Sequence, residues 1–168
     1  LWIIQECKRH WDKKGEKHSF AELAKLSSNA EPFFAFIDPD DATFSAPGDM
    51  PARICEYCKK TGQPIPETIG QILRVTTDSL ALKYRVVYER IIKLTGRNYA
   101  RLNAGGGGIQ NEALCQATAN ALGIEVQAGP IEATSCGNII TQMLATKEIK
   151  TFSEGRDLIR ESFNFKIY

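Results

Sequence analysis

The chain has 168 residues, of which 43% are hydrophobic and 24% charged, and its formal net charge is +1. This composition is ordinary for a soluble globular protein with a sizeable core, and the balanced charge gives no case for binding nucleic acid or a membrane. No apolar run approaches the length of a membrane span, and no signal-peptide segment opens the chain, so we expect a cytoplasmic protein.

The first four residues, Leu-Trp-Ile-Ile, lack an initiator Met and look like the inside of a helix, so we expect a fragment of a longer chain. Apolar residues at helical spacing, among them Cys7 and Trp11, predict a helix over residues 1–14. Gln5 falls between these apolar positions. Its position in the pattern alone assigns it to the solvated surface.

Ser19 and Glu22 form a capping box that predicts a second, short helix. The apolar run at residues 33–37 is strand-like, and the acidic turn at residues 38–41 closes it. The turn does not follow the calcium-loop pattern, because Ala42 and Thr43 stand where a ligand and a glycine are needed. We interpret it as a turn stabilised by its own aspartate side chains.

Asp49 is placed to cap a helix that ends at Gly62 and carries the Cys55-x-x-Cys58 pair. A zinc site needs about four ligands, and no second pair of Cys or His residues lies nearby in the sequence. The five cysteines are odd in number and scattered, which favours reduced thiols that pack as small hydrophobes.

The longest helical pattern runs over residues 67–94. Its apolar positions form a continuous stripe, which predicts a buried structural helix without chemistry of its own. The stripe consists of Leu73, Leu80, Tyr84, Val87, Tyr88, Ile91 and Leu94.

The rest of the chain alternates strands and helices, which predicts an α/β unit. A strand at residues 101–104 leads through four glycines, Gly105 to Gly108, into a helix that ends at Gly123. A second strand at residues 124–127 precedes a helix from about Glu132, and a last short helix follows. In the helix from Glu132 the pattern turns Ile139, Ile140, Met143 and Leu144 inward, and Ser153 with Glu154 begins the last helix.

The glycine run can let a ligand lie directly on the backbone, and the next helix offers free N–H groups. Two phosphate-binding motifs are excluded. No Lys-Ser or Lys-Thr follows the glycines, as a P-loop requires. The third glycine of a dinucleotide fingerprint is replaced by Gln110 or Asn111, depending on the register.

Several motifs together resemble the FGGY carbohydrate kinases, whose fold is the actin and Hsp70-like ATPase. They include residues 106–114, the Gly-Pro-Ile-Glu-Ala-Thr stretch at 129–134, the following Gly137-Asn138, and the acidic segment at 37–41. The resemblance spans nearly the whole chain. The stretch at 129–134 is most similar to the branch that phosphorylates L-rhamnulose to L-rhamnulose 1-phosphate.

The resemblance implies a helix-rich α/β fragment with a small sheet, of the actin-like (ribonuclease H-like) class, with residues 1–168 as the C-terminal nucleotide-binding domain. It implies that the Gly107 backbone touches ATP, with Gly106 and Gly108 beside it. Gln5 matches a glutamine that contacts the nucleotide from the facing helix. The Asn111 amide is placed to hydrogen-bond the ribose or the adenine edge.

The resemblance also implies partners and absences. ATP or ADP, Mg²⁺ and a ketose sugar are expected for the full-length enzyme. The catalytic aspartate and the phosphate-binding residues of such kinases lie in earlier segments, so we expect no catalytic residue, no metal ligand and no kinase activity in this fragment. Two departures from the family, Asn103 before the glycines and Asn120 in place of an Asp, weaken the strand and the helix packing.

Alternatives stay open at this point. Another FGGY kinase, such as a fuculokinase or xylulokinase, has the same motifs in outline. A non-catalytic regulator or assembly module could keep an actin-like nucleotide slot without transferring phosphate. The glycines could also serve chain geometry alone in a stable folded core.

Overall fold

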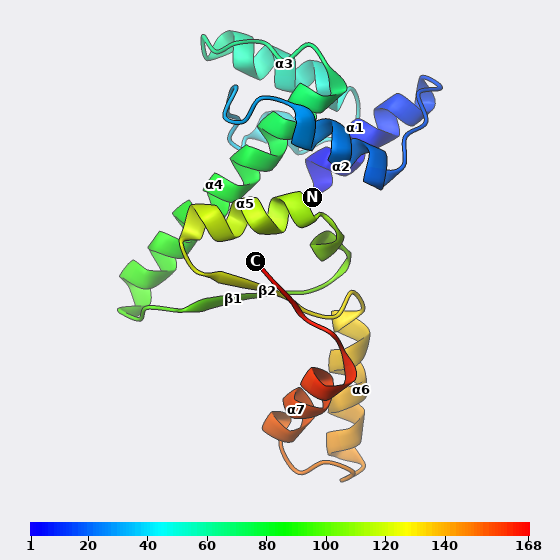
Figure 1. The fold of residues 1–168 in the computed structure, drawn as a ribbon, viewed down its shortest axis with the longest axis vertical. Helices are drawn as coiled ribbons and strands as arrows, with labels where there is room; N and C mark the ends of the chain where they lie inside the picture. The colour runs from blue at the N-terminus through cyan, green and yellow to red at the C-terminus, as the bar shows by residue number, and fades with distance from the viewer. The chain divides into compact units, whose positions relative to one another are not determined.

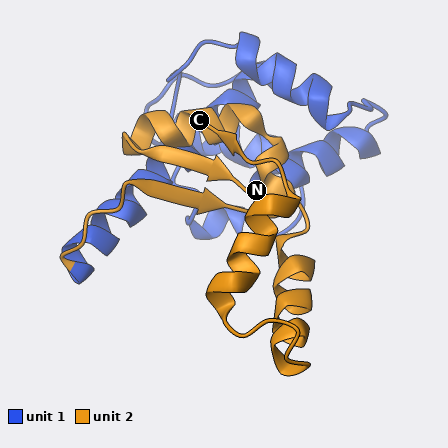
Figure 2. Ribbon diagram, turned by 60° about the horizontal axis from the view of Figure 1, so that its bottom comes forward, with its two compact units in different colours: residues 1–95 blue, residues 96–168 orange.

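A computed structural model describes all 168 residues, and the chain divides into two compact units, residues 1–95 and 96–168 (Figure 2). The first unit holds α1 (Trp2–Lys13), α2 (Phe20–Asn29), the 3₁₀ turn η1 (Ala42–Phe44), α3 (Met50–Lys60) and α4 (Ile69–Thr95). The second unit holds β1 (Arg101–Ala104), the 3₁₀ turn η2 (Gly107–Gln110), α5 (Glu112–Leu122), β2 (Glu125–Ala128), α6 (Ala133–Ala145), α7 (Phe152–Ser162) and β3 (Lys166–Ile167). None of the helices combines the length and apolarity needed to cross a bilayer.

The core of the first unit lies between α4 and the helices around it. The predicted capping box opens α2, with Ser19 Oγ accepting from the Glu22 amide at 3.2 Å and the Glu22 side chain accepting in return. Helix α2 packs along α4, and Gly70 permits their close approach. A Cβ on Gly70 would lie 2.5 Å from the carbonyl oxygen of Leu26.

The predicted burial of α4 is correct only for its first half. Leu73 and Leu80 are buried, but Ile91 is exposed and Leu94 is 85% exposed. The buried residues of α4 all lie between Gly70 and Ala81. The stripe is therefore continuous in sequence, whereas burial stops partway along the helix.

The strand-like run at residues 33–37 forms no strand in the structure. Backbone amides of this run donate hydrogen bonds to polar side chains of another segment and not to a neighbouring strand. Asp78 accepts from the Phe33 amide at 2.8 Å, and Ser79 Oγ accepts from the Ile37 amide at 2.9 Å. Asp78 is itself buried and paired with Arg74 at 2.9 Å. The run is thus hydrogen-bonded to side chains of α4, and it joins no sheet.

The acidic turn is stabilised by aspartate side chains, as predicted. Asp38 accepts from the Asp40 amide at 3.1 Å, and Asp41 caps η1 by accepting from Thr43 at 2.8 Å. Lys83 of α4 reaches both Asp38 and Asp40 at 2.8 Å. Hydrogen bonding to the Lys83 ammonium holds the pKa of Asp38 below its usual value.

The cysteines of the first unit pack as apolar groups. Cys7 of α1 and Cys58 of α3 are buried, and burial raises the pKa of both thiols. Cys55 is half-buried and its thiol donates to the Pro66 carbonyl at 3.3 Å. All five cysteines of the chain are free.

The second unit is built on a small mixed sheet in the order β1-β2-β3. Strands β1 and β2 are parallel and pair Arg101 with Glu125 through Ala104 with Ala128. Helix α5 packs on β2, where Val126 and Ala128 are buried. Gly123, at φ +68°, ends α5 in the left-handed conformation, as the sequence predicted.

Helices α6 and α7 lie side by side as a hairpin (Figure 1). Gly155 lets them approach, because a Cβ there would lie 2.5 Å from the Cγ2 atom of Ile140. The prediction that Ile139 points inward is wrong, since its side chain is 56% exposed whereas Ile140 is buried. Thr151, rather than Ser153, caps α7 by accepting from Glu154 at 3.2 Å.

Candidate functional site

The carboxyl ends of β1 and β2 meet at one edge of the sheet. Because the two strands are parallel, the glycine turn after β1 and the Gly129-Pro130 turn after β2 leave the sheet at the same edge. This is the edge at which open α/β sheets bind ligands. Each turn also leads to a helix, α5 and α6, whose first N–H groups lie beyond it.

Two backbone hydrogen bonds join the turns. The Gly106 amide donates to the Pro130 carbonyl at 3.1 Å, and the Gly129 amide donates to the Ala104 carbonyl at 2.6 Å. The glycine turn is therefore held on one side by the second turn.

The glycines of the run differ in what restricts them. A Cβ on Gly105 would lie 2.9 Å from the Cβ of Ala133, so this position is restricted by packing. Gly106 has φ +83°, a backbone conformation that side chains disfavour. Gly107 has neither constraint, since a Cβ there would meet nothing within 4 Å, and the residue is exposed. The main chain at Gly106 and Gly107 thus borders open space.

The sequence predicted that the glycines lead directly into a helix. In the structure the last two, Gly107 and Gly108, belong to the 3₁₀ turn η2, and α5 begins only at Glu112. Asn111 is the N-cap of α5, and its Oδ1 accepts from the Leu114 amide at 3.1 Å. Because the helix cap uses the Oδ1 atom of Asn111, the NH₂ group of the same side chain is the part suited to donate a hydrogen bond to a ligand.

Gln5 lies on α1 with an exposed side chain, flanked by buried Ile4 and Glu6. It belongs to the first unit, whereas the glycine turn belongs to the second. That the two contact one nucleotide from facing sides stays a prediction.

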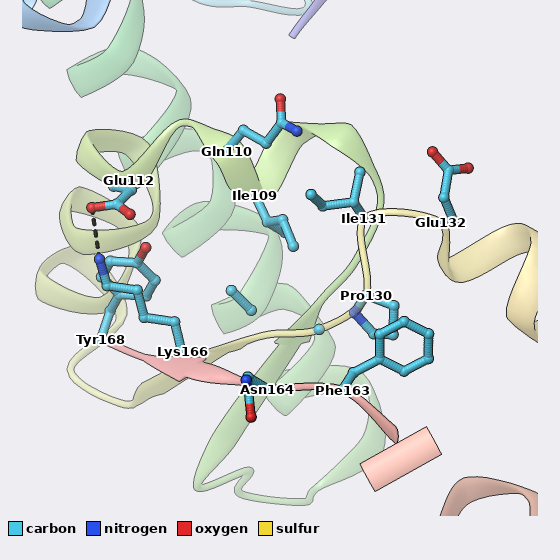
Figure 3. Close-up of a pocket in the computed structure, with 12 residues that line it drawn as sticks. Ile109, Gln110, Glu112, Pro130, Ile131, Glu132, Phe163, Asn164, Lys166 and Tyr168 are labelled. Atoms are coloured by element: carbon cyan, nitrogen blue, oxygen red, sulfur yellow. Dashed lines mark ion pairs between the residues drawn. The ribbon is translucent and has the colours of Figure 1, made fainter. Parts of the chain in front are cut away.

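A hollow of about 410 Å³ lies beside the glycine turn, within the second unit (Figure 3). Ile109 and Gln110 of η2 border it on one side, and the turn after β2, including Ile131, borders it on another. The chain end closes it with Phe163, Asn164, Lys166 and Tyr168. The walls are mainly apolar, with charged groups at the Lys166 end.

An ion pair stands at that end of the hollow. Lys166 Nζ lies 2.6 Å from Glu112 Oε2 and 5.1 Å from the centre of the Tyr168 ring (Figure 3). Hydrogen bonding to Glu112 raises the pKa of Lys166, and burial raises the pKa of Tyr168. Sequence reasoning missed these residues and the Pro130 carbonyl. The motif at 129–134 marked the turn, but nothing in the sequence marked the chain end.

Nothing in the chain gathers three or more His, Cys, Asp or Glu side chains that could hold a metal ion. The chain therefore offers no metal site built from protein ligands alone, and we assign no metal ligand among these residues. What this edge offers is main-chain N–H groups, the Asn111 amide and an adjoining apolar hollow, which suit the binding of an uncharged or anionic ligand.

Comparison with known proteins places the chain in a family. Residues 1–146 match the C-terminal domain of the FGGY family of carbohydrate kinases, and the chain belongs to this family. The resemblance to the family and the actin-like, helix-rich fold with a small sheet are thereby confirmed.

Several rhamnulokinases are similar to this chain. Those of Bacteroides thetaiotaomicron, Enterococcus faecalis and Bacillus subtilis are 43%, 41% and 37% identical to this chain over 168, 170 and 168 residues. Each alignment covers 100% of this chain and 34% of the relative. The chain thus spans about a third of the length of the curated relatives it matches.

Proposed function

We propose that residues 1–168 are the C-terminal nucleotide-binding part of a longer, cytoplasmic sugar kinase. The whole enzyme would transfer the γ-phosphoryl group of ATP to L-rhamnulose and release ADP and L-rhamnulose 1-phosphate. Family membership supports an ATP-dependent sugar kinase, and the names of the relatives support rhamnulose as its substrate. Mg²⁺ would come with ATP, as phosphoryl transfer requires, and the residues that hold it would lie outside this chain.

The observation that carries the proposal is the open main chain at Gly107. Gly107 has ordinary backbone angles and no close neighbour, so neither strain nor packing requires glycine there, and its place after the carboxyl end of β1 leaves room for a ligand to lie on the backbone. In this proposal adenosine lies on the backbone of Gly106, Gly107 and Gly108. The Asn111 NH₂ group binds the ribose or the adenine edge, and Gln5 is carried over from the family resemblance as a further nucleotide contact.

Each of these residues binds and orients; none moves a proton or attacks phosphorus. Phosphoryl transfer depends mainly on positioning and on charge stabilisation, with a base that orients the sugar hydroxyl. Holding adenosine fixes one end of ATP, and this restricts where its γ-phosphoryl group can lie. The base and the phosphate ligands belong to segments outside residues 1–168, so this chain alone is expected to bind without catalysing.

The binding site is tested by calorimetry with ADP on the full-length enzyme. We expect Gly107→Val to remove the heat of binding, because its side chain would occupy the space left for adenosine. Gly137→Val is the matched control: Gly137 is also exposed, with open space around its Cα, and lies in the same unit. Equal, sizeable heats for wild type and Gly107→Val would contradict the site.

The substrate is tested by assaying the full-length enzyme with ATP against a panel of ketoses. The expected result is the highest kcat/KM with L-rhamnulose. A preference for xylulose or fuculose would reject the rhamnulose assignment within the same class of kinase. Nucleotide binding without phosphoryl transfer to any sugar would instead favour a non-catalytic actin-like module.

A further inference from the structure

Residues 163–168, here called the C-terminal strap, run beside the candidate site. Within the strap, β3 pairs antiparallel with β2, and Val126 and Tyr168 exchange backbone hydrogen bonds at 3.0 and 3.1 Å. The family match ends at residue 146, whereas the rhamnulokinase alignments cover the whole chain. Residues 163–168 therefore lie beyond the matched family domain but within the part of the chain that aligns with those relatives.

Phe165 connects the strap to the turn after β2. A Cβ on Gly129 would lie 3.2 Å from the Cε1 atom of Phe165 and 3.2 Å from the Ala104 carbonyl oxygen. Gly129 is thus packed between the Phe165 ring and the end of β1. The aromatic ring is half-buried and lies against Gly129.

The contact continues from that turn to the glycines. Pro130 follows Gly129 directly, and its carbonyl accepts from the Gly106 amide at 3.1 Å. The path from ring to ligand site is therefore Phe165, Gly129, Pro130 and Gly106. Every step in it is a packing contact, a covalent bond or a hydrogen bond within the second unit.

A second connection reaches the helix that follows the glycines. Lys166 pairs at 2.6 Å with Glu112, the first residue of α5 and the neighbour of Asn111. Both side chains are more than half exposed, so the pair contributes little stability by itself. The strap thus contacts the turn after β2 through Phe165 and the start of α5 through Lys166.

We propose that the C-terminal strap positions the glycine turn for nucleotide binding, and that Phe165 is the residue on which this depends. The inference rests on the proposed function, because a positioning residue needs a ligand to position for. Phe165 touches no substrate here; it acts through the Gly129-Pro130 turn. When the ring is removed, the turn is free to shift, and the Gly106 amide with it.

The test is steady-state kinetics and ADP calorimetry on the full-length kinase. For Phe165→Ala we expect KM for ATP and the Kd of ADP to rise about three- to tenfold, as for other coupled contacts, while KM for the sugar stays unchanged. Phe165→Leu should restore most of the affinity by refilling the space over Gly129. Ile167→Ala is the matched control, because Ile167 is in the same strap but 55% exposed.

The possible outcomes distinguish failure of the strap proposal from failure of the proposed nucleotide site. Wild-type enzyme that binds no ADP would overturn the proposed function. If wild type binds ADP and Phe165→Ala has an unchanged KM for ATP, the strap proposal is overturned, even where the melting temperature falls. An equal loss in Ile167→Ala would also overturn it. Should Phe165→Ala fail to fold, Phe165→Val decides, because valine leaves part of the space over Gly129 empty: a two- to threefold higher KM for ATP supports the proposal, and no change overturns it.

Discussion

Replacing Gly70 with alanine tests how tightly α2 and α4 pack. The new Cβ would lie 2.5 Å from the Leu26 carbonyl oxygen and 3.1 Å from the carbonyl carbon, and both are backbone atoms. Because a backbone carbonyl cannot rotate away as a flexible side chain does, α2 would have to move by about 1 Å to restore ordinary contact.

The size of the effect follows from two opposing contributions. Overpacking of a closely packed contact costs about 1–3 kcal/mol, and replacing a helical glycine by alanine gains about 0.5–1 kcal/mol. Gly70 lies in the first turn of α4, where that gain is at its smallest. We expect a net loss of about 1–2 kcal/mol, which lowers Tm by roughly 2–4 °C per kcal/mol at this size.

Urea denaturation monitored by circular dichroism measures the difference. Gly137→Ala in α6 is the control, because nothing lies within 4 Å of its added Cβ, and it should stabilise by about 0.5–1 kcal/mol. If Gly70→Ala is as stable as wild type, or gains as much as Gly137→Ala, the close approach of α2 and α4 is not what restricts position 70.

Two further predictions concern the buried and the exposed charges of the first unit. Asp78→Asn should destabilise by about 1–3 kcal/mol in the same urea assay, because Arg74 and the Phe33 amide lose a charged acceptor; an unchanged midpoint would refute this. The bond to Lys83 lowers the pKa of Asp38, so its stabilisation is present above the unfolded pKa and is lost as pH falls below about 4. The stability difference between wild type and Lys83→Met should therefore persist at neutral pH and vanish in acid, and a difference that stays constant down to pH 2 would contradict it.

The sequence predicted a feature correctly where the residues that determine it lie close together in the chain. The Ser19 capping box, the Asp49 cap and the Gly123 helix end all formed as predicted, because each is decided within one turn of chain. The strand-like run at residues 33–37 failed for the opposite reason. Its backbone partners, Asp78 and Ser79, lie more than 40 residues away, and nothing in the run itself reveals them.

The candidate site shows the same division. The glycines were recognised, but the sequence could not assign the different roles of Gly105, Gly106 and Gly107, which depend on what stands beside each Cα. Strand β3 has only two residues, too few to give a periodic pattern. The strap was therefore missed, although its pairing with β2 closes one edge of the sheet.

The contact between Gly105 and Ala133 limits how this site can diverge in related sequences. A Cβ at position 105 would stand 2.9 Å from the one at position 133, so only one of the two positions can carry a side chain without shifting a turn. Alanine at position 105 becomes acceptable once position 133 is glycine. If position 105 changes first, the intermediate is strained; if position 133 changes first, the intermediate is loosely packed. The two positions are therefore epistatic, and a scan that changes one residue at a time would report each as less tolerant than the pair.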